Sequence, residues 1–241
     1  MKIQQTAIIE YDEVDSNFQL KLPMLFQRFQ RAALHHSEIV GLGPQTLMQN
    51  SGAWILHWVL VEIYRMPSYQ EKLTVQTWNK GAKGVRAERA FSLTCDGETI
   101  CVAESQWLYF DLERQRIVKI PKEAIDPYTT EKENVLNIGA VDFAVDRRFE
   151  PEEVLSLSTR EGDYDSNGHV NNTVYLEYLD TLLKRSHFGS GQRNRVAIQF
   201  VKEIGRKVHT VQVGASKESA SVKFRFFKGS TVYAAGFIET S

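Results

Sequence analysis

Two stretches of the sequence, VDSNFQLKLPMLFQRF at residues 14–29 and YDSNGHVNNTVYLEYL at residues 164–179, share the triplet Asp-Ser-Asn. An offset of 150 residues separates Asp15 from Asp165. After each triplet, apolar residues recur every three or four positions, which is the period of a helix with one buried face. A turn and a helix repeated at one offset indicate that the chain contains an internal duplication.

β-rich segments follow both predicted helices in the same order. The segments that resemble each other are VEIYR at 61–65 and KEIGR at 202–206, then LTVQTW at 73–78 and HTVQVG at 209–214. Asp96-Gly97 and Lys228-Gly229 have the composition of hairpin turns. Each half is therefore predicted to be one long helix packed on a curved antiparallel sheet, which is an α+β architecture.

The chain is expected to divide near its middle. Residues 121–149 have mixed polarity and little periodicity, so we expect them to cross the surface between the two halves. The predicted division is an N-terminal domain at 1–125, a connector at 126–148 and a C-terminal domain at 149–241. The glycines expected to end the two helices are Gly41, Gly43 and Gly189.

The composition limits the class of protein. The chain has 241 residues, 42% of them hydrophobic, and a net charge of -1, so it can bury a core but has no overall attraction to nucleic acid or anionic membrane. The most apolar stretch, at 54–63, is too short to span a bilayer, and no secretory signal is visible. Cys95 and Cys101 are a lone pair, expected to be reduced. We therefore predict a cytoplasmic protein with no nucleic-acid partner and no membrane span.

The polar stretch before the second helix partly matches a calcium loop. Asp163, Asp165, Asn167 and Gly168 occupy the first six positions of an EF-hand loop in the expected pattern. The twelfth position, where a bidentate glutamate should close the calcium shell, is Val174. No entering helix is predicted before the loop. Calcium binding is therefore disfavoured, and we expect no metal and no cofactor.

A purely structural interpretation explains part of the same stretch. Asn167 or Asn171 can cap the following helix, and Gly168 can supply a turn conformation. Capping is the preferred interpretation for Asn171 and Asn172. It leaves His169 unexplained.

The duplication favours a functional role for this histidine. Where the second half has Gly168 and His169, the first half has Phe18 and Gln19. The fold therefore does not need Gly-His to form the turn and the helix. A polar set present in only one half is what a site retained in one copy would leave.

Asp165, Asn167 and His169 alternate along the sequence, so on an extended segment their side chains would point the same way. The N-terminus of the following helix supplies backbone N–H donors and a positive dipole end. A carboxylate, an amide, an imidazole and such donors are the components of an acyl-transfer site. The chain has no G-x-S-x-G elbow, and no cysteine lies near this histidine in sequence, so attack by water or by a carboxylate is favoured.

The motif DYDSNGHVNNTVYLEYL at 163–179 resembles the D-x-N-x-H-V-N-N signature of acyl-ACP thioesterases, the plant FatA/FatB type and its bacterial relatives. The stretches at 53–78 and 104–123 resemble the strands of that family's first domain and the segment that closes it. The resemblance implies a tandem double hotdog fold. It also implies hydrolysis of the thioester between a fatty acyl chain and acyl carrier protein, in fatty acid biosynthesis.

Carried over position by position, the family's catalytic residues fall on Asp165, Asn167 and His169. A further acidic residue, in the family's strand motif E-C-G-R, falls on Glu203, with Ile204 at the cysteine position. That difference argues against a cysteine nucleophile. The first-half counterpart of Glu203 is predicted to be Glu62, from the match of VEIYR with KEIGR.

The expected mechanism leaves two roles open for the carboxylates. Asp165 or Glu203 activates a water, or Asp165 attacks the thioester directly through a transient anhydride. Asn167 and His169 orient the reacting groups, and His169 can protonate the departing thiolate. Backbone N–H groups near Val170 and Asn171 are expected to polarise the carbonyl.

The family places the acyl chain largely in the first hotdog, so the N-terminal domain is expected to bind it without a catalytic set. The candidate lining residues are Met24, Phe26, Trp54 and Trp58, for each of which ordinary core packing is the alternative. Acyl carrier protein is acidic, so a basic docking face is expected. Its candidate segments are 80–86, Arg147-Arg148, Lys184-Arg185 and 193–195.

Two alternative functions remain open from the sequence. An acyl-CoA thioesterase would use the same site with another carrier, and a non-catalytic acyl-binding hotdog protein would use none of its chemistry. Either a monomer or a homodimer is compatible with two hotdogs in one chain.

Overall fold

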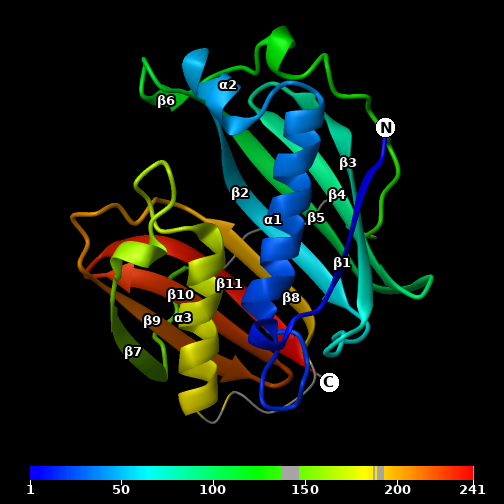
Figure 1. Cartoon of the computed structure of the whole chain (residues 1–241). Helices are drawn as coiled ribbons and strands as arrows, with labels where there is room; N and C mark the ends of the chain where they lie inside the picture. Colours follow the sequence, from blue (N-terminus) through cyan, green and yellow to red (C-terminus); the bar gives the residue numbers. More distant parts are fainter. Residues whose placement is uncertain (137–146, 187, 189–192, 241) are drawn as a thin grey trace. The chain divides into compact units, whose positions relative to one another are not determined.

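The computed structural model describes residues 1–136, 147–186, 188 and 193–240. The chain divides into two compact units. The N-terminal unit ends at Gly139, and the C-terminal unit starts at Ala140, with Leu22–Met24 grouped in the second. In each unit one long helix lies along an antiparallel sheet (Figure 1).

The N-terminal unit has a five-stranded antiparallel sheet in the order β1-β3-β4-β5-β2, and the short β6 pairs with β5. Its strands are β1 (Ile3–Ile8), β2 (Gly52–Ile63), β3 (Lys72–Lys83), β4 (Arg86–Cys95), β5 (Glu98–Asp111) and β6 (Arg116–Ile117). Its helices are α1 (Leu22–Ile39) and the short α2 (Pro44–Gln49), with 3-10 turns η1 (Tyr11–Glu13) and η2 (Lys122–Ala124).

The C-terminal unit repeats this plan with the strand order β8-β11-β10-β9-β7. Its strands are β7 (Glu153–Ser158), β8 (Arg193–Phe200), β9 (Thr210–Glu218), β10 (Ser221–Lys228) and β11 (Thr231–Thr240). A 3-10 turn, η3 (Glu161–Asp163), precedes its single long helix, α3 (Asn172–Arg185).

Both predicted helices are confirmed, and each buries the apolar face that its sequence defines. The ring of Phe29 on α1 lies 5.0 Å from that of Phe91 on β4, and the ring of Tyr175 on α3 lies 5.0 Å from that of Phe226 on β10. Gly41, just after α1, adopts a left-handed φ of 75° as predicted for a helix end. The predicted end of the second helix, Gly189, lies outside the described residues.

Paired strands correct one of the matches between the two halves. β1 pairs Ile3 with Thr77, and β7 pairs Glu153 with Ala215. Because Ile3 and Glu153 are related by the same 150-residue offset as the Asp-Ser-Asn triplets, Thr77 corresponds to Ala215. The match of LTVQTW with HTVQVG had paired Thr77 with Val213, so that prediction is wrong by two residues. Both alignments keep the same sheet face, since side chains alternate with a period of two.

The segment expected to cross the surface after Pro121 is instead packed against the N-terminal unit as far as Leu136. Tyr128 and Leu136 are buried, and the hydroxyl of Tyr128 donates to Ser37 Oγ on α1. The backbone N–H groups of Val135 and Leu136 donate to the buried carboxylate of Glu104. Residues 137–146 lie outside the described part of the chain.

Candidate active site

The polar stretch ahead of α3 is a closed turn. Asp165 N–H donates to His169 O at 2.8 Å, and Gly168 N–H donates to Asp165 O at 3.0 Å. The carboxylate oxygen Oδ1 of Asp165 accepts from the N–H groups of Asn167 and His169, at 2.9 and 3.2 Å. Gly168 has a φ of 75°, which is strained for other residues. The expected extended segment is therefore wrong, because the Asp165 side chain bonds its own backbone and bends the chain.

The N-terminal unit forms the same turn with different chemistry. Asp15 Oδ1 accepts from the N–H groups of Asn17 and Gln19, at 2.8 and 3.2 Å, and Phe18 N–H donates to Asp15 O at 3.0 Å. Phe18 has the left-handed φ of 59° that Gly168 adopts in the second unit. Holding the turn is therefore a structural task that both aspartates perform. Asn17 is the counterpart of Asn167, so the imidazole of His169, where the N-terminal unit has Gln19, is the side chain that sets the second turn apart.

A short backbone ladder brings the segment of Glu203 to this turn. His169 forms an antiparallel bridge with Gly205, and Val170 N–H donates to Ile204 O at 2.9 Å. His169 and Glu203 are both exposed, whereas Ile204 is fully buried. The structure thus places the four predicted catalytic residues on two adjoining segments of one unit.

The N-terminal unit has the equivalent ladder, which identifies the true counterpart of Glu203. Gln19 bridges Ser68, and Leu20 N–H donates to Pro67 O at 2.8 Å. Ser68 therefore corresponds to Gly205, and Met66 corresponds to Glu203. The prediction that Glu62 is the counterpart is wrong, because Glu62 lies within β2. The carboxylate at position 203 belongs to the C-terminal unit alone.

Tyr175, on the first turns of α3, lies beneath both segments. Burial raises the pKa of its phenol, and the charges of Glu203 and Asp165 raise it further, while a hydrogen bond with the backbone of Ile204 opposes them. Both carboxylates are therefore close enough to act on one phenol. The sequence gives no signal for this role of Tyr175, because its position in the apolar helical pattern predicts only a core residue.

The N-terminus of α3 offers fewer free donors than expected. Val170 N–H is bonded to Ile204 O, and Asn171 N–H donates to Asp163 O at 2.8 Å. The prediction that these two groups polarise a carbonyl is therefore wrong. Asn171 is confirmed as the helix cap, since its side chain accepts from Thr173 N at 3.0 Å. Asn172 N–H, in the first turn, has no acceptor in the described part of the chain.

Asp163 faces inward and is not available to a calcium ion. Its carboxylate is 2% exposed and accepts hydrogen bonds from Arg160 and from the hydroxyl of Tyr178 on α3. Burial alone raises the pKa of this carboxyl, but the hydrogen bonds from Arg160 and Tyr178 outweigh burial and hold the pKa below its ordinary value. The first position of the calcium pattern thus anchors η3 to α3.

Charged groups at the edge of the turn were missed by the sequence analysis. Arg206 forms an ion pair with Glu161 at 2.5 Å and lies over the ring of Tyr164, 4.6 Å from its centroid. In the N-terminal unit, the positions of Glu161 and Arg206 are taken by Tyr11 and Tyr69, whose rings contact each other edge to face at 6.0 Å. The corrected alignment is needed to see that the ion pair of Glu161 and Arg206 replaces the aromatic pair of Tyr11 and Tyr69.

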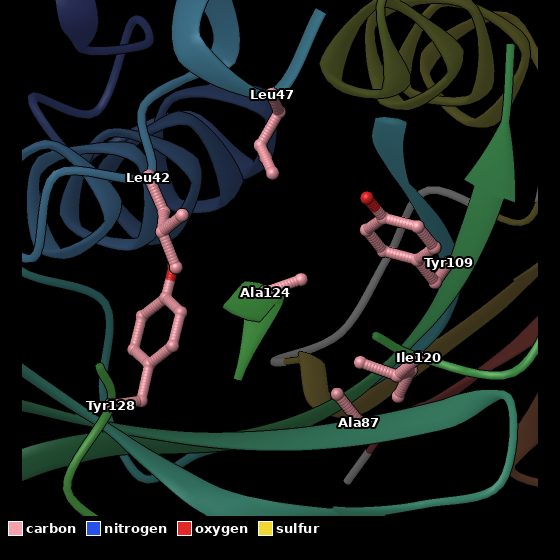
Figure 2. Close-up of a cluster of buried hydrophobic side chains, with 7 residues drawn as sticks. All are labelled: Leu42, Leu47, Ala87, Tyr109, Ile120, Ala124 and Tyr128. Atoms are coloured by element: carbon pink, nitrogen blue, oxygen red, sulfur yellow. The ribbon is translucent and has the colours of Figure 1, made fainter. Parts of the chain in front are cut away.

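The four predicted acyl-chain residues have different environments. Phe26 is buried and lies edge-on to Phe29, 6.3 Å between centroids, so it is core of α1. Trp54 is half-buried and packs edge-on against Tyr109 at 5.2 Å, beside the buried apolar cluster drawn in Figure 2. Met24 and Trp58 are also half-buried. The cluster in Figure 2 comprises Leu42, Leu47, Ala87, Tyr109, Ile120, Ala124 and Tyr128.

The described residues contain no group of three or more His, Cys, Asp or Glu side chains placed to hold a metal ion. Among the helices of residues 1–136, 147–186, 188 and 193–240, none has the length and apolar character needed to cross a membrane.

Two units, each with one long helix on an antiparallel sheet and a polar turn ahead of that helix, define a double hotdog protein. The sequence matches the acyl-ACP thioesterase N-terminal domain over residues 1–128 and the acyl-ACP thioesterase C-terminal domain over residues 147–233. The chain belongs to the acyl-ACP thioesterase family.

Individual relatives are distant in sequence. An acyl-[acyl-carrier-protein] hydrolase of Cuphea viscosissima is 23% identical over 86% of this chain and 53% of its own length. A palmitoyl-acyl carrier protein thioesterase of Arabidopsis thaliana is 24% identical over 84% of this chain and 52% of its own length. The chain thus spans about half the length of the curated relatives it matches.

Solved structures support the fold over the whole chain. A crystal structure of an acyl-ACP thioesterase from Bacteroides thetaiotaomicron has a TM-score of 0.88 at 22% identity, covering 100% of this chain and 98% of that one. The 12:0-ACP thioesterase from Umbellularia californica has a TM-score of 0.83 at 18% identity, covering 100% and 97%. At these identities the likeness establishes the double hotdog fold alone.

Proposed function

We propose that the protein hydrolyses the thioester of fatty acyl-acyl carrier protein and releases free fatty acid. The observation that carries this proposal is the contrast between two otherwise equivalent turns. Both units keep the aspartate and the asparagine of the turn, but only the C-terminal unit adds His169 and the adjoining Glu203. The family of the chain supports a thioester substrate for that set.

In the proposed reaction, Asp165 is the general base. Its Oδ1 is held by two backbone N–H groups, so its Oδ2, which has no partner in the described part of the chain, keeps a fixed direction. A rigidly held carboxylate is what proton abstraction from an attacking water requires. The water oxygen bonds to the carbonyl carbon, and its proton passes to Oδ2.

The carbon–sulfur bond breaks in the second step. His169 is exposed on the same turn and donates a proton to the departing thiolate, after which the proton on Asp165 restores the imidazolium through solvent. The unbonded N–H of Asn172, at the positive end of α3, replaces Val170 and Asn171 as the proposed donor to the developing oxyanion. Glu203 orients the water from the adjoining segment, and Asn167 orients the thioester.

The division of labour between the units is also a proposal. We assign the catalytic groups to the C-terminal domain at 149–241 and acyl-chain binding to the N-terminal domain at 1–125, with the half-buried Trp54, which packs against the apolar cluster, as its first candidate. Acyl carrier protein is the proposed partner. Lys80 is excluded from its docking face, because this side chain is buried in an ion pair with Glu104 at 2.6 Å.

The subcellular location and the oligomeric state of the protein are tested by separate measurements. The names of the plant relatives place them in the chloroplast. For this chain we propose the cytoplasm, supported by Cys95 and Cys101, which are both free thiols and buried. Cell fractionation tests this location. Light scattering separates the monomer from the homodimer.

The reaction is tested by measuring free fatty acid released from acyl-ACPs of increasing chain length, with matched acyl-CoAs in competition. His169→Ala should lose activity, and the matched control Gln19→Ala, at the equivalent position of the N-terminal unit, should keep it. Preference for acyl-CoA would point to the alternative carrier. Absence of turnover on either carrier would contradict the proposal and favour an acyl-binding protein.

A further inference from the structure

A cluster of buried polar groups lies between α1 and the sheet of the N-terminal unit. Arg89 on β4 is 8% exposed, and its Nη1 donates to His36 Nδ1 at 2.9 Å and to Thr77 Oγ1 at 3.2 Å. His36 is fully buried, and its ring lies edge-on to Tyr128 at 5.1 Å. In the described part of the chain, no carboxylate pairs with this guanidinium.

The cluster has more donors than acceptors. A guanidinium can only donate, so His36 Nδ1 accepts and His36 Nε2 carries the proton, yet Nε2 is buried without a partner. Asn79 lies directly opposite Arg89 in the β3–β4 ladder, and its buried Nδ2 also has no partner, because only its Oδ1 is used, by Gly81 N–H. Burial lowers the pKa of Arg89 to about 10.

The fold itself does not require these groups. Since Thr77 corresponds to Ala215, the β9–β10 ladder places Val222 at the position of Arg89 and Lys217 at that of Asn79. Val222 is buried in the sheet of the C-terminal unit. α3 ends at Arg185, so the extra turn of α1 that carries His36 has no counterpart in the second helix. The cluster therefore belongs to the N-terminal unit alone.

Apolar side chains adjoin the buried polar groups Arg89, His36 and Asn79. Tyr128, bonded to Ser37 beside His36, is a member of the apolar cluster in Figure 2, as is Ala87, on the same face of β4 as Arg89. Tyr109 of that cluster also lines a pocket of about 780 Å³ in the same unit. The apolar cluster thus adjoins the pocket through Tyr109, and it adjoins the buried polar groups through Tyr128, whose ring centroid lies 5.7 Å from the guanidinium carbon of Arg89.

We propose that the N-terminal unit binds a long-chain carboxylate, whose anionic group pairs with Arg89 and whose aliphatic chain lies among the side chains of the apolar cluster. A carboxylate has only acceptors, so it satisfies Arg89, His36 Nε2–H and Asn79 Nδ2 together. A neutral hydroxyl would leave the guanidinium uncompensated, which is costly in a buried site. The proposal shares the apolar cluster with the acyl-chain site of the proposed function and adds to it a buried group that recognises a carboxylate, whose binding is measured without hydrolysis.

Binding is tested directly on the full chain by calorimetric titration with decanoate, decan-1-ol and acetate. Decanoate should bind at least tenfold more tightly than decan-1-ol or acetate. Two variants remove the anion site in different ways. Arg89→Met deletes the cation, and Asn79→Asp places an internal carboxylate opposite Arg89. Both should weaken decanoate binding at least tenfold, and Arg225→Met, a control in the C-terminal unit, should not.

Stability provides a second readout without ligand. An arginine that serves only the fold would make Arg89→Met less stable. If Arg89 lacks a carboxylate partner because it binds a ligand, we expect Arg89→Met and Asn79→Asp to keep or raise the thermal midpoint of the ligand-free protein. Decanoate binding unchanged in both variants, equal binding of decan-1-ol, or no decanoate binding by the wild type would each overturn the proposal.

The carboxylate could be that of a free fatty acid or the far end of a dicarboxylic acyl chain, and the same variants separate these sources. Faster hydrolysis of sebacoyl-ACP than of decanoyl-ACP, lost in Arg89→Met, identifies the acyl chain. Inhibition by decanoate without that preference identifies the free acid. If the wild-type protein binds decanoate but hydrolyses no acyl-ACP, the proposed function is contradicted and the carboxylate site is still supported.

Discussion

Replacing Asp165 by asparagine separates its structural task from its proposed chemistry, because the chain contains a matched control. Asp165 and Asp15 are both half-buried, and each accepts two backbone N–H bonds through Oδ1 at closely similar distances. Asparagine keeps that oxygen but removes the charge. Each substitution therefore weakens two charge-assisted bonds to neutral ones, which is worth about 1–2 kcal/mol of unfolding free energy in either unit.

The two variants should differ in activity. Loss of a general base lowers the rate by roughly 10²- to 10⁴-fold, or about 3–5 kcal/mol in activation free energy, so Asp165→Asn should lose nearly all hydrolysis. Asp15→Asn should keep it. Urea unfolding and fatty acid release from acyl-ACP, measured on the same preparations, provide the comparison. Near-normal turnover by Asp165→Asn, or an equal loss in Asp15→Asn, would refute the assignment of Asp165 as base.

Three further outcomes follow from the geometry. Gly168→Ala should destabilise the protein by about 1–2 kcal/mol, because its φ is 75°, although a Cβ there would make only an ordinary contact with Arg206 Nε at 4.0 Å. Gly162→Ala, where the space for a Cβ is open, should be neutral or stabilising in the same urea titration. Tyr178→Phe should cost about 1–3 kcal/mol by removing the donor to buried Asp163, against a smaller loss for Tyr164→Phe; equal losses in urea unfolding would contradict this. Burial, and then Arg89, lowers the pKa of His36 to about 4, so the unfolded chain takes up this proton first and stability should fall between pH 6.5 and about 4. His36→Gln should lack that part of the pH dependence of unfolding, and a full dependence in the variant would place its origin elsewhere.

Local features of the site could be predicted from the sequence because their partners are close along the chain. The Asp165 turn closes over five residues, the Asn171 cap bonds two residues ahead, and the periodicity of α1 and α3 depends only on local spacing. The 150-residue offset aligns the two turns correctly because the bonds that close each turn are also local. These interactions are the same wherever the segments lie in the fold.

Features that depend on strand register could not be predicted in this way. The sequence matched Glu203 with Glu62, but the ladders assign Met66, because the two halves differ in length between the helix and the strands. The same distant contacts occupy the N–H groups of Val170 and Asn171 that local reasoning had left free. Backbone groups find their partners only when sheet register is fixed, and register depends on packing rather than on local sequence.

Burial was also decided by tertiary structure. The basic residues around Lys80 predict a surface face, yet Lys80 lies buried against Glu104. Arg89 is buried in a strand of alternating polarity, where the local pattern does not distinguish it from an exposed arginine. The sequence by itself therefore determined the duplication, the two helices and the turn that holds the candidate catalytic groups. Only the tertiary structure decided which carboxylate adjoins that turn and which cation is left unpaired in the interior, because both depend on which distant segments are packed together.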